Sequence, residues 1–96
     1  MMNKKQILMD YLDSNLFTPI IHSPNVSCQI KYEITHIKFL LNQFCAEGII
    51  SYIWNTLANK DIELIISNRL IDEGFYSYPQ IINEFKLKFT YDWLIS

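Results

Sequence analysis

The longest helical pattern in the chain lies in residues 30–50, which read IKYEITHIKFLLNQFCAEGII. Apolar side chains recur there every three or four residues and would form one stripe along a helix. The stripe consists of Ile30, Ile34, Ile37, Leu41, Phe44 and Cys45. Gly48 stands where a left-handed C-terminal cap would end such a helix. We therefore predict a helix over about 31–47, followed by a strand over the apolar, β-branched run 49–54.

The segment before this pattern predicts a helix and a connection. Asn3–Gln6 has the spacing of a capping box, and apolar residues at helical spacing follow it, so we predict a first helix over residues 4–14. Pro19 and Pro24 come next. Because proline disfavours helix for itself and for the residue before it, residues 15–24 are predicted to form a connection.

The second half of the chain gives mixed signals. Residues 56–74 share an apolar helical face and end at a glycine, which favours a helix, while part of 62–67 also fits a strand. The helical face contains Ile62, Ile65, Ile66 and Leu70, and the residues that break the pattern are Leu64, Arg69 and Ile71. Residues 85–91 alternate between apolar and polar side chains, which predicts a half-buried strand. Its inward set would be Phe85, Leu87, Phe89 and Tyr91.

The composition indicates one folded domain over residues 1–96. Half of the 96 residues are apolar and 19% are charged, whereas disordered chains combine low hydrophobicity with high net charge. The eight cationic side chains are scattered and the net charge is −2, so the sequence lacks the basic stripe of nucleic-acid-binding domains. No apolar run reaches the roughly 20 residues of a membrane span, and no secretory signal precedes the two cysteines, which favours a reduced, cytoplasmic protein.

Two segments resemble uncharacterised winged-helix domains of phages and low-GC bacteria. Residues 32–50, where a helix ends in an acidic residue, a glycine and two isoleucines, resemble the third helix and first wing strand, and residues 85–94 resemble the returning wing strand. The resemblance implies an α+β fold with about three helices and a small antiparallel sheet. It also implies that residues 31–47 would read DNA in members that bind it, with asparagine and glutamine placed for adenine edges. In this chain two lysines and two glutamates balance on that helix, which leaves few phosphate anchors, and many winged helices bind proteins instead.

Metal-binding and catalytic patterns are missing from the sequence. The metal-ligand types His22, Cys28, His36 and Cys45 are spaced six, eight and nine residues apart, whereas zinc sites usually show close pairs. The sequence has no nucleophile elbow, and its two glycines cannot form a phosphate-cradling loop. We therefore expect no metal, no cofactor and no enzyme activity.

Aromatic side chains give the strongest functional signal. Six phenylalanines, six tyrosines and two tryptophans exceed what one small core needs, and such rings are enriched in interface hot spots. Phe39 lies opposite the apolar stripe of residues 31–47, and two tyrosines follow Gly74 closely. The predicted partner-binding residues are Phe39, Tyr76, Tyr78, Trp54, His36 and Gln43. The alternative is that the rings only fill the core and cover its rim.

These observations predict a small, non-enzymatic protein-binding module that occludes a partner protein by docking an apolar and aromatic face on it. Size and composition are typical of accessory, inhibitory or immunity-type proteins of phages and mobile elements. One alternative is a winged-helix DNA-binding transcriptional regulator, whose affinity would fall steeply with salt. Another is a homodimer whose aromatic face is its own interface.

Overall fold

The elements of the structure are helices joined by short turns. The computed structural model describes residues 3–57 and 59–95. Its α-helices are α1 (Lys4–Leu12), α2 (Thr18–Ile21), α3 (Cys28–Asn42), α4 (Ala46–Tyr52), α5 (Lys60–Asp72), α6 (Tyr78–Lys88) and α7 (Tyr91–Ile95). Two π-helical turns, η1 (Asp13–Phe17) and η2 (Ile53–Leu57), extend α1 and α4. Long helical rods therefore replace the mixture of helices and strands that the sequence suggests.

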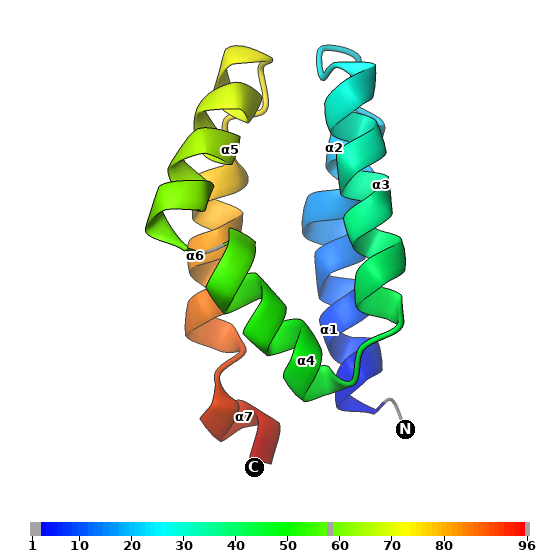
Figure 1. Ribbon diagram of the computed structural model, residues 1–96, viewed down its shortest axis with the longest axis vertical. Coiled ribbons are helices and arrows are strands. Elements are labelled where there is room, and N and C mark those ends of the chain that lie inside the picture. Colours follow the sequence, from blue (N-terminus) through cyan, green and yellow to red (C-terminus); the bar gives the residue numbers. More distant parts are fainter. Residues whose placement is uncertain (1–2, 58, 96) are drawn as a thin grey trace.

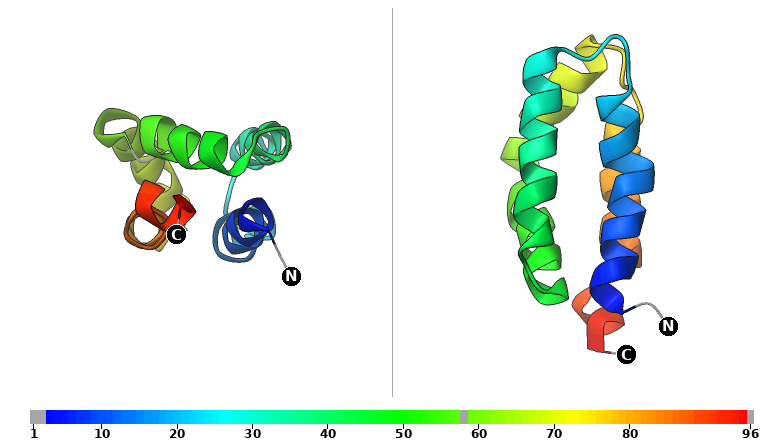
Figure 2. Two further views of the ribbon diagram at one scale, coloured as in Figure 1. Left: turned by 90° about the horizontal axis from the view of Figure 1, so that it is seen from below. Right: turned by 90° about the vertical axis from the view of Figure 1, so that its right-hand side faces the viewer.

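The helices lie in two layers (Figures 1 and 2). One layer contains α3, α4 and α5, and the other contains the rod of α1, η1 and α2 together with α6 and α7. Helix α2 packs on α3 and α5 packs on α6, while α4 contacts α1 and α7. Both chain ends lie at the same end of the molecule, where the Lys4 ammonium donates to the carbonyls of Trp93 and Leu94 at 2.5 and 2.8 Å.

The core consists of aliphatic and aromatic side chains that most of the helices contribute. Its fully buried members include Leu8, Leu12, Leu16, Phe17, Ile20, Leu41, Ile49, Ile50, Ile53, Leu70, Tyr78 and Phe85. Burial of one such side chain contributes about 1.5–3 kcal/mol, so this cluster is the main source of the stability of the fold.

Side-chain caps fix where several helices begin. At the starts of α1, α3 and α5, a side-chain oxygen accepts a backbone N–H that has no partner within the helix. The pairs are Asn3 with the Gln6 amide at 2.8 Å, Ser27 with the Ile30 amide at 3.4 Å, and Asn59 with the Asp61 amide at 3.1 Å. The first pair confirms the predicted cap at Asn3, and the predicted helix over 4–14 is confirmed as α1 with the start of η1.

The first rod continues through most of the predicted connection, residues 15–24. At η1 the Thr18 amide donates to the carbonyl of Asp13, five residues earlier rather than four. This wider turn lets the ring of Pro19 avoid the carbonyl that it would strike in a regular α-helix. The rod therefore runs to Ile21, and the predicted connection is wrong over that length.

The predicted helix over 31–47 is confirmed only as far as Asn42, where α3 ends. Cys45 is extended and begins α4, so Gly48 lies inside a helix and does not cap one. The predicted strand over 49–54 is wrong, because that run continues α4 and enters η2. A short, continuous apolar run fits a buried helix as well as a buried strand, and here packing selects the helix.

Within the predicted span 56–74, helix α5 confirms the helical interpretation over Lys60–Asp72, and the alternative of a strand within 62–67 is wrong. Leu70 is buried and Ile66 is partly buried against the core, as predicted, whereas Ile65, which the same predicted face included, is 63% exposed. The side chains of Ile62 and Leu64, which entered that prediction, lie outside the described residues.

A Schellman motif ends α5. Gly74 has a φ of +90°, in the left-handed region that glycine occupies without strain. Its amide donates to the Ile71 carbonyl at 3.0 Å, and the Phe75 amide donates to the Leu70 carbonyl at 2.7 Å. The predicted role of Gly74 at a helix end is confirmed, and this tight turn directs the chain back into α6.

The predicted strand over 85–91 is wrong, because these residues end α6 and begin α7. Ile82, Phe85 and Phe89 are buried at spacings of three and four, the pattern of one helix face. Leu87, which a strand would bury beside the two phenylalanines, is 75% exposed.

The predicted fold class is therefore wrong. The described residues contain helices and no strand, so an α+β winged helix with a small antiparallel sheet does not fit the structure. The chain forms an all-α bundle. The expectation that residues 31–47 read DNA rested on the winged-helix resemblance and stays a prediction.

Candidate protein-docking surface

An exposed stripe of large side chains runs along the outer face of α3. Tyr32 is 74% exposed and Phe39 is 67% exposed, and His36 and Gln43 are exposed beside them. Their spacings of four, three and four place them on one helix face. We call these four residues the α3 stripe. It contains three of the six predicted partner-binding residues, together with Tyr32.

The opposite face of α3 is anchored in the core. Ile30, Ile34 and Leu41 are each less than 5% exposed there. This anchoring fixes the backbone positions from which the rings of the α3 stripe project, although the exposed side chains themselves remain free to change rotamer. A backbone that is already ordered loses little conformational entropy when it binds.

A groove lies beside Phe39, between α3 and the first rod. It has a volume of about 310 Å³, near the lower limit of ligand pockets, which run from about 300 to 1,000 Å³. Its lining residues are Met9, Asp13, Ile21, Thr35, Lys38, Phe39 and Asn42. Lys38 and Asp13 form an ion pair at 2.8 Å across it, and both side chains are about 40% exposed. The groove is thus an apolar depression whose two charges neutralise each other.

Sequence reasoning missed the part of this groove that the first rod supplies. Met9, Asp13 and Ile21 recur at intervals of four and eight residues, a spacing that places them on one side of a continuous helix. The spacing becomes visible only if the first helix continues past Pro19. Because residues 15–24 are predicted to form a connection, the prediction does not place Ile21 on the same helix as Met9 and Asp13.

The other predicted rings do not share the α3 stripe. Trp54 belongs to η2 and is 37% exposed. The ammonium of Lys86, on α6, lies 4.9 Å from the centroid of the Trp54 ring. Tyr76 is 74% exposed in the turn between α5 and α6. Tyr78 is fully buried and its hydroxyl donates to the Leu57 carbonyl at 3.4 Å. Tyr78 is therefore a core residue in this fold and cannot contact a partner, which corrects its predicted role.

Tyr11 and Glu84 form a second polar cluster, between α1 and α6. The Tyr11 hydroxyl donates to a Glu84 carboxylate oxygen at 3.5 Å, and the Lys88 ammonium lies 5.2 Å from the Tyr11 ring centroid. Burial raises the pKa of Tyr11, and the charge of Glu84 and its hydrogen bond raise it further. Burial alone raises the pKa of Tyr52. A higher tyrosine pKa keeps the phenol protonated, so neither ring is activated as a base or nucleophile.

The cysteine and histidine side chains lie at the surface. Cys28, Cys45, His22 and His36 are exposed, and both cysteines are free. Within residues 3–57 and 59–95, no three His, Cys, Asp or Glu side chains come close enough to hold a metal ion.

Comparison with known proteins finds no matching family model, no matching curated protein and no matching solved structure. In the part of the chain that the structure describes, none of the helices combines the length and the hydropathy needed to cross a membrane. The surfaces of this molecule are therefore the basis on which a function can be proposed.

Proposed function

We propose that this protein is a small, non-enzymatic binding module of the cytoplasm that docks the α3 stripe on another protein and blocks it sterically. This is the mode of action of an accessory, inhibitory or immunity-type protein. The observation that carries the proposal is the exposure of Tyr32 and Phe39, two large rings seven residues apart on one face of an anchored helix.

Two exposed rings on a fixed helix favour binding. Complete burial of an aromatic side chain contributes about 1.5–3 kcal/mol, and Phe39 and Tyr32 still expose most of their area. The groove beside Phe39 adds a depression that a partner side chain can enter. Aromatic anchors next to such depressions are typical of interface hot spots.

The charges favour a polypeptide partner over a nucleic acid. Six of the eight cationic side chains already contact a ring, a carbonyl or a carboxylate of the protein itself: Lys4, Lys5, Lys38, Arg69, Lys86 and Lys88. Binding to a phosphate backbone depends on cations that replace its counterions. A partner with an apolar, weakly charged surface suits the α3 stripe better.

The test compares three variants for binding to a purified partner. Candidate partners are first captured from cells of the source organism on the immobilised wild-type protein, and each is then purified and titrated by calorimetry. The Phe39→Ala and Tyr32→Ala changes remove stripe rings, and Leu87→Ala removes an equally exposed apolar side chain on α6. We expect each stripe variant to weaken binding about tenfold or more and the Leu87 variant to bind normally.

Two results would contradict the proposal. One is a partner whose affinity is unchanged by both stripe substitutions. The other is binding to duplex DNA that drops by orders of magnitude between low and moderate salt, which would show phosphate recognition instead.

A further inference from the structure

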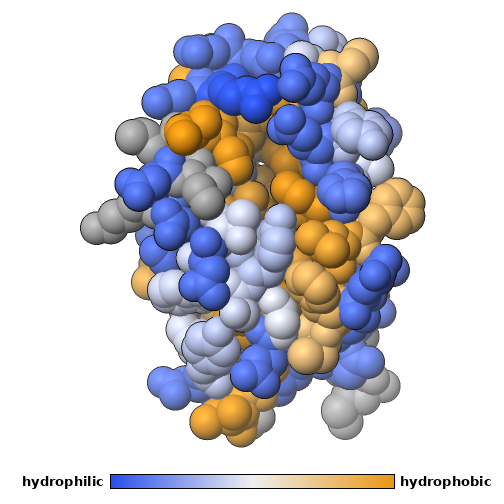
Figure 3. Space-filling model, viewed as in Figure 1, coloured by the Kyte–Doolittle hydropathy of each residue, from blue (hydrophilic) through white to orange (hydrophobic). Residues whose placement is uncertain are grey.

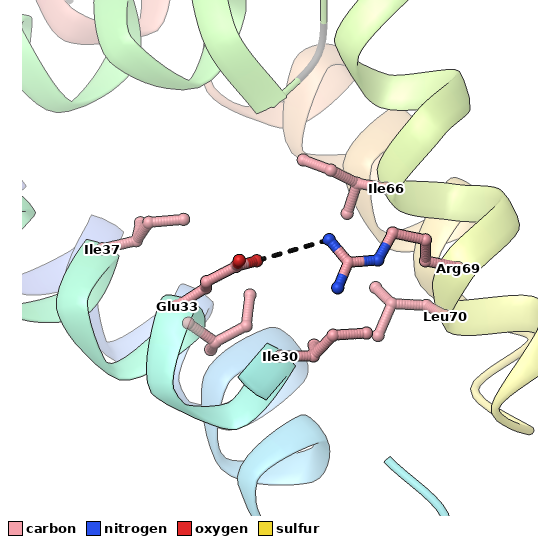
Figure 4. Close-up of a pocket in the computed structure, with 7 residues that line it drawn as sticks. Ile30, Glu33, Ile37, Ile66, Arg69 and Leu70 are labelled. Atoms are coloured by element: carbon pink, nitrogen blue, oxygen red, sulfur yellow. Dashed lines mark ion pairs between the residues drawn. The ribbon is translucent and has the colours of Figure 1, made fainter. Parts of the chain in front are cut away.

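Cationic side chains tie neighbouring helices together at the surface, and these ties differ in strength. A weak one spans a hollow between α3 and α5, where apolar side chains gather (Figure 3). The Arg69 guanidinium reaches a Glu33 carboxylate oxygen at 3.6 Å across this hollow (Figure 4), and both side chains are nearly half exposed. A pair as open to water as this one contributes little to stability. The hollow encloses only about 30 Å³, room for little beyond a water molecule, so it is no ligand pocket.

The tie between α1 and α7 is stronger. The Lys4 ammonium is partly buried and donates to the carbonyls of Trp93 and Leu94 at 2.5 and 2.8 Å. It also lies 5.1 Å from the centroid of the Trp93 ring, within cation–π range. The last carbonyls of a helix lack partners within the helix and favour a positive charge, and hydrogen bonds from a charged donor are strong. Lys4 therefore holds the end of α7 on α1.

Helix α7 depends on this tie because the core buries little of it. The helix has five residues, and none of them is fully buried. Trp93 and Leu94 are partly buried against the core, while Tyr91 is 48% exposed and Ile95 is 83% exposed. A helix of this length is not stable by itself in water. Segments with few buried contacts also open at a lower free energy than the rest of a fold.

The junction between α6 and α7 has the construction of a hinge (Figure 1). Phe89 ends α6 with a φ of −114° and a ψ of 84°, outside the helical region. The Phe89 amide still donates backwards, to the Phe85 carbonyl at 2.8 Å. The Trp93 amide donates to the Thr90 hydroxyl and the Leu94 amide donates to the Thr90 carbonyl, each at 3.1 Å. A rotation about the ψ of Phe89 therefore moves α7 without breaking any of these three hydrogen bonds.

We propose that α7 is a strap that opens about Phe89 while the other helices stay folded, and that Lys4 holds it closed. In the closed state the Trp93 and Phe89 rings lie edge to face with their centroids 4.8 Å apart, and Phe89 is only 1% exposed. Opening removes the Trp93 ring and uncovers Phe89, which creates an apolar surface at this end of the molecule. The strap contains no residue of the α3 stripe, so its motion and the proposed partner binding can be tested independently.

Amide hydrogen exchange of the full chain, followed residue by residue by NMR, tests the strap. In the wild type, the Trp93 and Leu94 amides should exchange about tenfold or more faster than the Phe85 amide inside α6, because α7 opens separately. In Lys4→Met, which keeps the length of the side chain and removes its charge, the two α7 amides should exchange about tenfold faster again. The Phe85 amide should keep its wild-type rate.

The neighbouring lysine provides a matched control. The Lys5 ammonium donates to the carbonyl of Asn42, at the end of α3, at 2.6 Å. Lys5→Met therefore removes the same charge from the same helix without touching α7. We expect it to leave the exchange of the α7 amides unchanged.

Fluorescence gives a second readout of the open strap. With Trp54→Phe as the background, Trp93 is the sole tryptophan of the chain, and adding Lys4→Met should increase its quenching by acrylamide. Equal exchange rates of the Trp93 and Phe85 amides in the wild type would overturn the proposal, because α7 would then open only with the whole bundle. Unchanged α7 exchange in Lys4→Met would overturn it as well, and so would a Lys4→Met variant in which α6 accelerates as much as α7.

Discussion

Leu87 distinguishes the helical structure of the C-terminal segment from the strand that its alternating pattern predicts. In a strand over 85–91, Leu87 would lie on the same buried face as Phe85 and Phe89. In α6 it is 75% exposed, while Phe85 is fully buried. Replacing Leu87 by alanine therefore has different expected outcomes in the two folds, whereas replacing Phe85 removes a buried ring in both.

The magnitudes follow from the contacts. The Phe85 ring lies 5.0 Å from the Phe89 ring and 6.1 Å from the Tyr11 ring, between centroids, with no solvent contact. Removing such a ring costs about 3–5 kcal/mol. Removing an exposed side chain usually changes the free energy of unfolding by less than about 0.5 kcal/mol. A domain of this length has a total stability of about 5–14 kcal/mol, so Phe85→Ala consumes a large fraction of it.

Urea unfolding followed by far-ultraviolet circular dichroism measures the difference. With an m-value of about 1.5 kcal/mol/M, Phe85→Ala should lower the midpoint by about 2–3 M, and Leu87→Ala should leave it nearly unchanged. Phe85→Leu is the fallback if the alanine variant does not fold, with an expected loss of about 1–1.5 kcal/mol. A Leu87→Ala loss as large as that of Phe85→Ala would refute the helical placement of this segment.

Two other predictions concern the end of α5 and the alkaline limit of stability. Gly74→Ala should destabilise the protein by about 1–2 kcal/mol, because alanine is strained at a φ of +90°. The added Cβ would not clash, since its nearest neighbour, Asn25, lies at an ordinary contact distance of 3.4 Å. An unchanged urea midpoint would contradict the Schellman assignment. The raised pKa of Tyr11 means that the folded state keeps its proton to higher pH than the unfolded state, so the free energy of unfolding falls as pH rises above the ordinary value of 10.0. Tyr11→Phe should make that alkaline decline shallower, and identical pH profiles of the two proteins would refute the burial effect.

The sequence predicts α3 well because both of its faces carry a clear signal. Its buried residues Ile30, Ile34 and Leu41 recur at helical spacing, and Phe39, His36 and Gln43, which the sequence predicts to bind a partner, are exposed. When a buried face and an exposed face both repeat at helical spacing, a helix is the element that fits the pattern. The candidate α3 stripe could therefore be located before the rest of the fold was known.

The two predicted strands failed for different reasons. The run 49–54 is apolar at almost every position, and periodicity carries no information when all faces are apolar. In 85–91 the buried pair Phe85 and Phe89 satisfies both a period of two and a helical spacing of four. Leu87 and Tyr91 separate the two interpretations, because a strand would bury both and they are 75% and 48% exposed. Ile82, one turn before Phe85, extends the helical pattern.

The distribution of aromatic side chains shows why their number alone could not identify the docking surface. Phe89 contacts Tyr11, Phe85 and Trp93 at centroid distances of 5.0, 5.0 and 4.8 Å, so a cluster between α1, α6 and α7 accounts for many of the rings that the sequence offers. Tyr11 lies on α1, whereas its ring partners lie near the end of the chain, on and after α6. Tertiary packing alone brings them together, and no local sequence pattern predicts it.

The rings that remain outside this cluster differ in what surrounds them. Trp54 has the Lys86 ammonium over its face, and Tyr76 lies in the turn between α5 and α6 rather than on a helix. Tyr32 and Phe39 are exposed on a helix whose other side is fixed in the core. Among Trp54, Tyr76, Tyr32 and Phe39, an anchored helix, high exposure and helical spacing coincide only for the two rings on α3. That coincidence, rather than the abundance of rings, is the physical basis for proposing partner binding at the α3 stripe.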